Sequence, residues 1–149
     1  MNEVRKPASW VNRGLLTFAT GAYVLLGTKY LANPIAASAA DGISLGSPAA
    51  VTDMRVIGAL FLACSVVTFL SLLSNRRHLD GLRFVLLVLG SVTLARAYGF
   101  LTDGTAPSTV LKLRNELILL AVFGAGALFE LYRQREAERA QSLSVAQGD

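Results

Sequence analysis

Four apolar runs dominate this chain, and each is about as long as a helix that crosses a membrane. The hydrocarbon core of a bilayer is ~30 Å thick, which takes about 20 mostly apolar residues in a helix. Hydrophobic residues make up 53% of the chain, only 16% of residues are charged, and the mean hydropathy is +0.50. These features predict an all-α integral membrane four-helix bundle rather than a soluble domain. The predicted spans are Gly14–Leu31, Met54–Leu73, Leu82–Leu101 and Val110–Leu131.

Basic residues flank these spans unevenly. Lys and Arg next to span ends are retained on the cytoplasmic side of a membrane. Residues 33–52 and 102–108 carry none, whereas the N-terminal segment, the link between the second and third spans and the C-terminal tail carry many. We therefore expect both termini to be cytoplasmic, and the net charge of +4 needs no nucleic acid to explain it. The predicted divisions are a cytoplasmic segment 1–13, a transmembrane domain 14–133 and a cytoplasmic tail 134–149.

Helix-start signals sharpen two of the span boundaries. Ser47 before Pro48 fits an N-cap followed by a first-turn proline, and Pro107 offers a similar start to the fourth span. The link 33–46 is rich in small residues and either rests on the outer interface or forms a loop. The tail is expected to prolong the fourth helix beyond the membrane.

No metal or cofactor motif is visible. The only cysteine, Cys64, lies in the middle of a span, and the only histidine, His78, lies in a polar turn. A metal site needs several such ligands at suitable spacing. We therefore expect no metal and no cofactor, with Cys64 a packing residue and His78 a loop residue.

Small residues inside the spans favour close packing, because they let membrane helices approach one another. The positions expected to serve in this way are Gly58, Ala59, Gly99, Gly124 and Ala125.

Charged residues lie inside three of the spans at about the same depth. With a rise of 1.5 Å per residue, Arg96 lies about 10 Å below Asp103 at the outer end of its helix, and Glu116 about 12 Å below Ser108 at the start of its helix. Arg55 reaches a comparable depth in the second span. An unpaired charge at the centre of the hydrocarbon costs about 2.5–3.5 kcal/mol, so these side chains are expected to face the bundle interior or each other. Arg96 is expected to pair with Glu116.

One face of the fourth span supports this arrangement, because its members recur at helical spacing. They are Glu116, Leu120, Phe123, Ala127 and Glu130.

Four further polar residues are expected at the edge of this layer: Asp53, Asp103, Tyr98 and Tyr23. Two arginines against one glutamate leave one positive charge. Guanidinium groups bind carboxylates and phosphates through two parallel hydrogen bonds, so an anionic headgroup, or a carbonyl-bearing lipid or quinone, would complete a site. The alternative is structural: the Arg96–Glu116 pair locks two helices, and Arg55 pairs with Asp53 or reaches the membrane surface.

The sequence also resembles the small bacterial four-helix membrane proteins of domain of unknown function 4345. The resemblance lies in "SPAAVTDMRVIGALFL" and "LARAYGFLTDGTAPSTVLKLRNELILL" and spans roughly residues 14–133. The residues on which the resemblance rests are Asp53, Arg55, Gly58, Ala59, Arg96, Asp103, Gly104 and Glu116. It implies a fold and a bacterial inner-membrane location, but no activity. The layout is also similar to that of the eukaryotic scaffold protein of ergosterol synthesis, which has four spans and tethers enzymes.

Two function classes follow. The first is a non-catalytic accessory or scaffold subunit of a membrane complex, with a lipid or headgroup site in the outer half of the bundle. Its partners would be membrane lipids and other integral membrane proteins, or further copies of the chain. The second is a small lipid- or quinone-handling enzyme or carrier that uses the Arg/Glu cluster. The absence of a nucleophile with a base, a metal cluster or a phosphate loop favours the first class.

Overall fold

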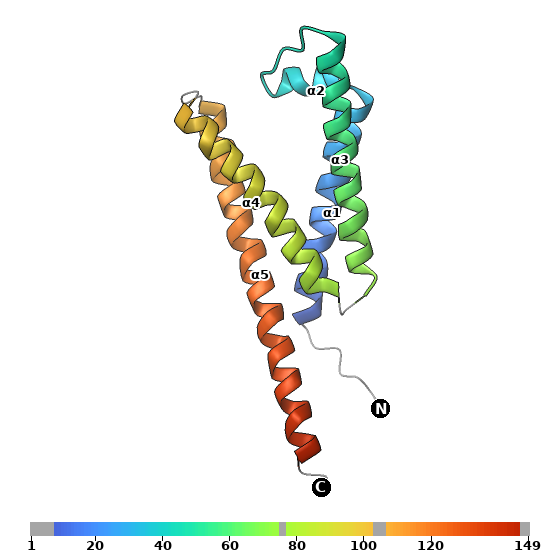
Figure 1. Ribbon diagram of the computed structural model, residues 1–149, viewed down its shortest axis with the longest axis vertical. Helices are drawn as coiled ribbons and strands as arrows, with labels where there is room; N and C mark the ends of the chain where they lie inside the picture. The colour runs from blue at the N-terminus through green and yellow to red at the C-terminus, as the bar shows by residue number, and fades with distance from the viewer. Residues whose placement is uncertain (1–7, 75–76, 103–106, 147–149) are drawn as a thin grey trace.

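The computed structural model describes residues 8–74, 77–102 and 107–146, and these ranges form helices joined by short links, without a strand (Figure 1). Four of the helices are long and apolar enough to cross a membrane. This is the architecture of a multi-pass membrane protein, and it confirms the all-α, four-span prediction. The helices are α1 (Ala8–Ala32), α2 (Pro34–Ala40), α3 (Pro48–Leu72), α4 (His78–Thr102) and α5 (Pro107–Ala146).

The helix starts follow local capping chemistry. The Ser47 hydroxyl accepts a hydrogen bond from the Ala50 amide at 3.2 Å, and Pro48 occupies the first turn of α3. Helix α5 begins at Pro107, as the sequence predicts. The link after α1 was expected either to rest on the interface or to form a loop. Part of it is the short helix α2 and not a loop, and α2 is capped by Asn33, whose side-chain oxygen accepts from the Ala36 amide at 3.3 Å.

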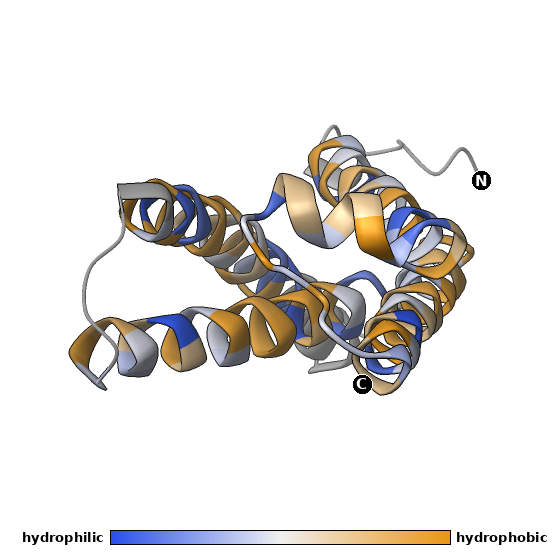
Figure 2. Ribbon diagram, turned by 90° about the horizontal axis from the view of Figure 1, so that it is seen from above, coloured by the Kyte–Doolittle hydropathy of each residue, from blue (hydrophilic) through white to orange (hydrophobic). Residues whose placement is uncertain are grey.

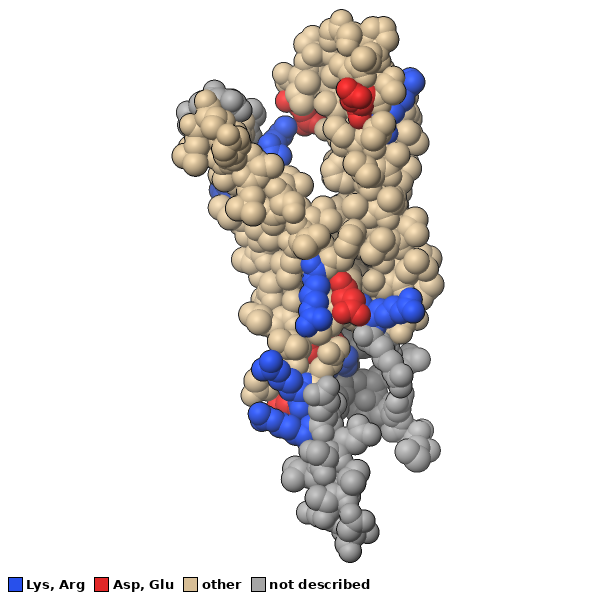
Figure 3. All heavy atoms as spheres, in the orientation of Figure 1, with Lys and Arg blue, Asp and Glu red and all other residues tan. Residues whose placement is uncertain are grey.

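The long helices form two pairs that diverge. Helix α1 packs along α3 and α4 packs along α5, and the pairs separate towards the end that carries α2 (Figures 1 and 2). The start of α1 and the end of α5 point to the opposite end (Figure 1). We call these the α2 end and the terminal end. In Figure 3 the molecule is visibly hollowed between the two pairs at the α2 end.

The buried apolar core explains this divergence, because its residues lie near the terminal end or near the middle of α1, α4 and α5, and none lies near the α2 end. Interior packing holds the two pairs together there, and the core does not continue between them at the α2 end. The core residues are Leu16, Ala19, Tyr23, Leu79, Leu82, Val85, Phe123 and Ala127.

Most of the apolar surface is left outside this core. Between 11% and 22% of the residues in the apolar window of each span are buried inside the chain. A helix that is apolar on nearly all sides needs a partner or lipid around it. Figure 3 shows a broad band on one face with few charges between the two ends, as expected for a surface in contact with lipid.

Glycines set the closest helix contacts, but only some of the expected ones do so. Gly58 on α3 lies against Gly27 on α1, and a Cβ added at Gly58 would come within 2.7 Å of the Leu31 nitrogen. Gly126 serves in the same way on α5, where an added Cβ would meet the Leu15 side chain at 2.6 Å. The expected packing role of Gly58 is therefore present, and Gly99 is partly buried.

The remaining small-residue predictions are wrong for packing within the chain. A Cβ added at Gly124 would meet nothing within 4 Å, and both Ala125 and Ala59 are exposed. The reason is rotational: the face of α5 that meets α1 carries Gly126, two residues further along, so Gly124 points elsewhere.

Candidate functional site

Arg96 and Glu116 form an ion pair between α4 and α5, the pairing that their common depth predicts. The Arg96 Nε donates to both carboxylate oxygens, at 2.9 and 3.0 Å, and Nη2 lies 2.9 Å from Oε1. The guanidinium therefore engages both oxygens of Glu116. The Arg96 side chain remains 28% exposed and that of Glu116 14% exposed, so the pair borders the space between the helix pairs rather than the closed core.

A second ionic centre lies next to this pair and was not predicted. Asp41, which caps the end of α2, accepts a hydrogen bond from Lys112 Nζ of α5 at 3.0 Å and lies 3.9 Å from Lys29 Nζ of α1. The Tyr30 hydroxyl of α1 also donates to Asp41. Asp41 thus ties the two helix pairs together across the α2 end.

The two centres form one layer, because Lys112 and Glu116 lie one turn apart on the same face of α5. Arg96 also acts electrostatically on Tyr30, which places it within range of the Asp41 centre. We call the set Lys29, Asp41, Arg96, Lys112 and Glu116 the charged layer. Three cations face two anions in it, so it carries one excess positive charge.

Asp41 is held in its charged form by its neighbours. The hydrogen bond from Tyr30, followed by Lys112 and Lys29, holds the pKa of the Asp41 carboxyl below its ordinary value and outweighs the opposing effect of burial. At neutral pH the link between α1, α2 and α5 is therefore ionic.

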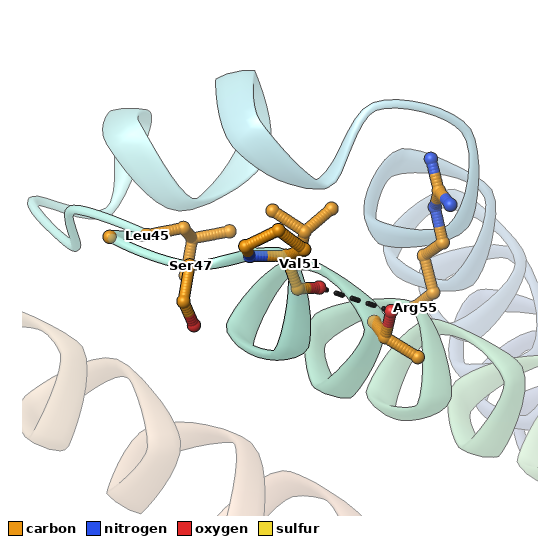
Figure 4. A pocket seen from close by; sticks show the side chains of 7 residues that line it. Leu45, Ser47, Val51 and Arg55 are labelled. Atoms are coloured by element: carbon orange, nitrogen blue, oxygen red, sulfur yellow. Dashed lines mark hydrogen bonds between the residues drawn. The ribbon is translucent and has the colours of Figure 1, made fainter.

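Arg55 does not join this layer through an ion pair. Among the residues that the structure describes, it pairs neither with Glu116 nor with Asp53, and its side chain is exposed. Arg55 lines an open pocket of about 500 Å³ at the start of α3. It lies on the side of that pocket opposite to Leu45 and Ser47 (Figure 4). The predicted Arg55–Asp53 pair is therefore wrong, and the reach of Arg55 towards the surface agrees with the other alternative.

The four polar residues expected at the edge of the layer lie in different parts of the structure. Asp53 and Tyr98 are exposed, and Asp103 lies outside the described residues. Tyr23 is buried in the core near the middle of α1 and stacks on Phe61 with ring centroids 6.1 Å apart. Neither tyrosine belongs to the charged layer. Tyr30, two turns of α1 closer to α2, supplies the hydroxyl instead.

A third polar group, buried at the terminal end, was also missed. Asn12 Nδ2 of α1 donates to Glu130 Oε2 of α5 at 2.6 Å, and Arg133 forms an ion pair with the same carboxylate. Asn12, His78 and Glu130 are all fully buried. We call Asn12, Arg13, His78, Glu130 and Arg133 the terminal-end cluster. The interpretation of His78 as a loop residue is wrong, because it begins α4 and its ring packs inside the bundle.

Only part of this cluster could be predicted from the sequence. Glu130 lies on the predicted stripe of α5, and Phe123, Ala127 and Glu130 on that stripe are buried. A charged residue on an otherwise apolar, buried helix face needs a polar partner, which a neighbouring helix can supply. The partner, Asn12, lies 118 residues away in the sequence, and no local pattern identifies it.

Comparison with known proteins adds a family. The chain matches the family described as Domain of unknown function (DUF4345) over residues 11–126. No curated protein and no solved structure matches it. The match covers the four predicted spans except the end of the last, together with the Arg96–Glu116 pair, and the chain, with its four candidate spans, belongs to this family of unknown function.

Proposed function

We propose that this protein is a non-catalytic accessory or scaffold subunit of a membrane complex that binds an anionic lipid headgroup in the charged layer. The observation that carries the proposal is the excess positive charge held between two diverging helix pairs, with Arg96 and Lys112 partly exposed. A phosphate group complements such a site because guanidinium and ammonium groups both donate to its oxygens.

The surrounding membrane is inferred from the sequence. The distribution of Lys and Arg favours cytoplasmic termini, which would place the charged layer in the outer half of a bacterial inner membrane. The exposed Ala59 and Ala125, and the partly exposed Gly124, offer surfaces where a helix of another membrane protein, or of a second copy, can approach closely.

The competing function is a lipid- or quinone-handling enzyme or carrier in which Glu116 accepts a proton. The geometry gives it less support, because the Arg96 guanidinium already engages both Glu116 oxygens. A substrate proton would have to displace this ion pair before it reached the carboxylate.

The lipid proposal is tested by retention of phosphatidylglycerol in nanodiscs made mostly of phosphatidylcholine, measured by native mass spectrometry. We expect the natural chain to retain phosphatidylglycerol. Lys29→Gln should weaken retention, because it removes one cation while leaving the Arg96–Glu116 pair intact. Arg96→Gln should weaken it further. Arg83→Gln is the matched control, because Arg83 lies on α4 and pairs with Asp80 away from the charged layer.

Each outcome decides between the candidates. Equal retention by all variants contradicts a headgroup site. A quinone that is retained from native membranes and lost with Glu116→Gln favours the carrier or enzyme. An identified membrane protein that co-purifies in fixed ratio with the natural chain supports the accessory role, and its persistence in Arg96→Gln assigns that role to other surfaces.

A further inference from the structure

The terminal-end cluster takes no part in the proposed lipid site and lies at the opposite end of the bundle. It brings a carboxylate, an imidazole, an amide and two guanidinium groups together where α1, α4 and α5 meet. Ionisable groups inside a membrane domain are costly to keep there, and chains of Glu and His are typical of proton-binding positions. The cluster is therefore the strongest feature left without a role.

His78 is the unusual member. Its side chain is fully buried, and neither ring nitrogen meets hydrogen-bond geometry with a protein partner in the described residues, although the Leu72 backbone lies close enough to act on the ring. Glu130, by contrast, accepts from both Asn12 and Arg133. The imidazole can therefore bind a proton without first breaking a side-chain hydrogen bond within the cluster.

The charges that act on His78 come from two helices. Glu130 and Arg133 of α5 and Arg13 of α1 are the ionised groups within range, and α3 contributes only the Leu72 backbone. With a neutral imidazole the cluster carries one excess positive charge, because two arginines face one glutamate. A proton on His78 raises that to two, with Glu130 as the opposing charge.

We propose that the terminal-end cluster is a proton-binding site, in which His78 takes up the proton and Glu130 stabilises the resulting imidazolium. The proton passes from the aqueous phase to the basic ring nitrogen, and no other bond forms or breaks. Histidine is suited to this because its imidazole can bind or release a proton, and here burial and the two arginines oppose the charged form while Glu130 favours it. The cluster joins the two helix pairs at their only apolar junction in the described residues. The positive charge that a proton adds therefore changes the electrostatic interactions between the helices at that junction.

The test uses the fact that the chain contains one histidine. A chain labelled with ¹⁵N in histidine gives a single pair of ring-nitrogen signals, which can be followed by NMR in lipid nanodiscs from about pH 4 to 9. We expect a reversible one-proton titration of these signals in the natural chain.

Two substitutions should move the midpoint in opposite directions. Glu130→Gln removes the opposing carboxylate and should lower the midpoint by about one pH unit or more, whereas Arg133→Gln removes a repelling cation and should raise it. Arg83→Gln, whose side chain is exposed on the same helix as His78, should leave it unchanged.

Other outcomes overturn the proposal. Ring signals that do not change across the pH range would show that His78 takes up no proton. Midpoint shifts in Glu130→Gln and Arg133→Gln no larger than in Arg83→Gln would show that the cluster does not control it. If one of the two variants fails to fold, the other still predicts a shift of defined sign.

Discussion

The two ends of this bundle hold ionic groups in opposite ways. At the terminal end, Glu130 is closed off from solvent and sits beside the apolar core. At the α2 end, the Arg96–Glu116 pair and Asp41 lie at a partly exposed opening between helix pairs. The comparison teaches that burial decides what an ion pair does: a closed pair fixes how helices join, whereas an open pair keeps donors accessible to a ligand.

Membrane topology offers the largest test of this contrast, because it decides which end faces outwards. Reporter fusions after Ala40 and after Gly104 should lie outside the cytoplasm, and a fusion after Arg77 should lie inside. The expectation follows from the Lys and Arg distribution. A reversed pattern would place the α2 end, with its charged layer, in the inner leaflet.

Removing a carboxylate should cost much more at the closed end. Glu130→Ala leaves Arg133 and Asn12 without their partner in a buried site, which typically costs about 3–5 kcal/mol. Glu116→Ala should cost about 1–2 kcal/mol, because Arg96 can turn towards the opening. Unfolding of both variants in lipid–detergent mixtures measures the difference. Equal losses would mean that the α2 end is closed as tightly as the terminal end.

The opening lies between the helix pairs and not within them, and this can be tested at Gly58. Gly58→Ala places a Cβ against the Leu31 backbone, so α1 and α3 must separate, at a cost of about 1–3 kcal/mol. Gly124→Ala is the control, since nothing lies within 4 Å of its added Cβ. The same unfolding assay should show a loss for the first variant only. A neutral Gly58→Ala would indicate that α1 and α3 are loosely packed at the α2 end.

Acid should loosen the α2 end before it unfolds the bundle, with the smallest effect of the four. Because the folded pKa of Asp41 is lowered, its stabilisation is present above the ordinary value of 3.8 and is lost as pH falls through the lower folded value. Spin labels at Ala36 and Leu111, in a Cys64→Ser background, should report a broader distance distribution at that point. Asp41→Asn should show the broad distribution already at neutral pH.

Much of the fold could be predicted because it depends on local chemistry. The spans follow from the length of the apolar runs, and α3 begins where a serine cap precedes a proline. The Arg96–Glu116 pair could be predicted because a fixed rise per residue converts sequence position into depth.

The remainder depends on how helices are rotated and where links cross. Asp41 lies in a link without periodicity, so its position between α1 and α5 had no signal. The predicted packing residue Gly124 is two positions from Gly126, and only the rotation of α5 against α1 decides between them. Arg55 was expected at the depth of Arg96, but its side chain is exposed, and a depth counted along the sequence does not reveal the direction in which a side chain faces.

Helix α5 runs unbroken for 40 residues, from the opening at the α2 end to Ala146, well past the terminal-end cluster. At 1.5 Å per residue it is about 60 Å long, twice the thickness of the hydrocarbon. Lys112 and Glu116 lie near one extremity, whereas Phe123 and Ala127 hold α5 in the apolar core near its middle. A ligand in the charged layer that tilted α5 about that junction would move the other extremity in the opposite direction by a similar distance, beyond the hydrocarbon.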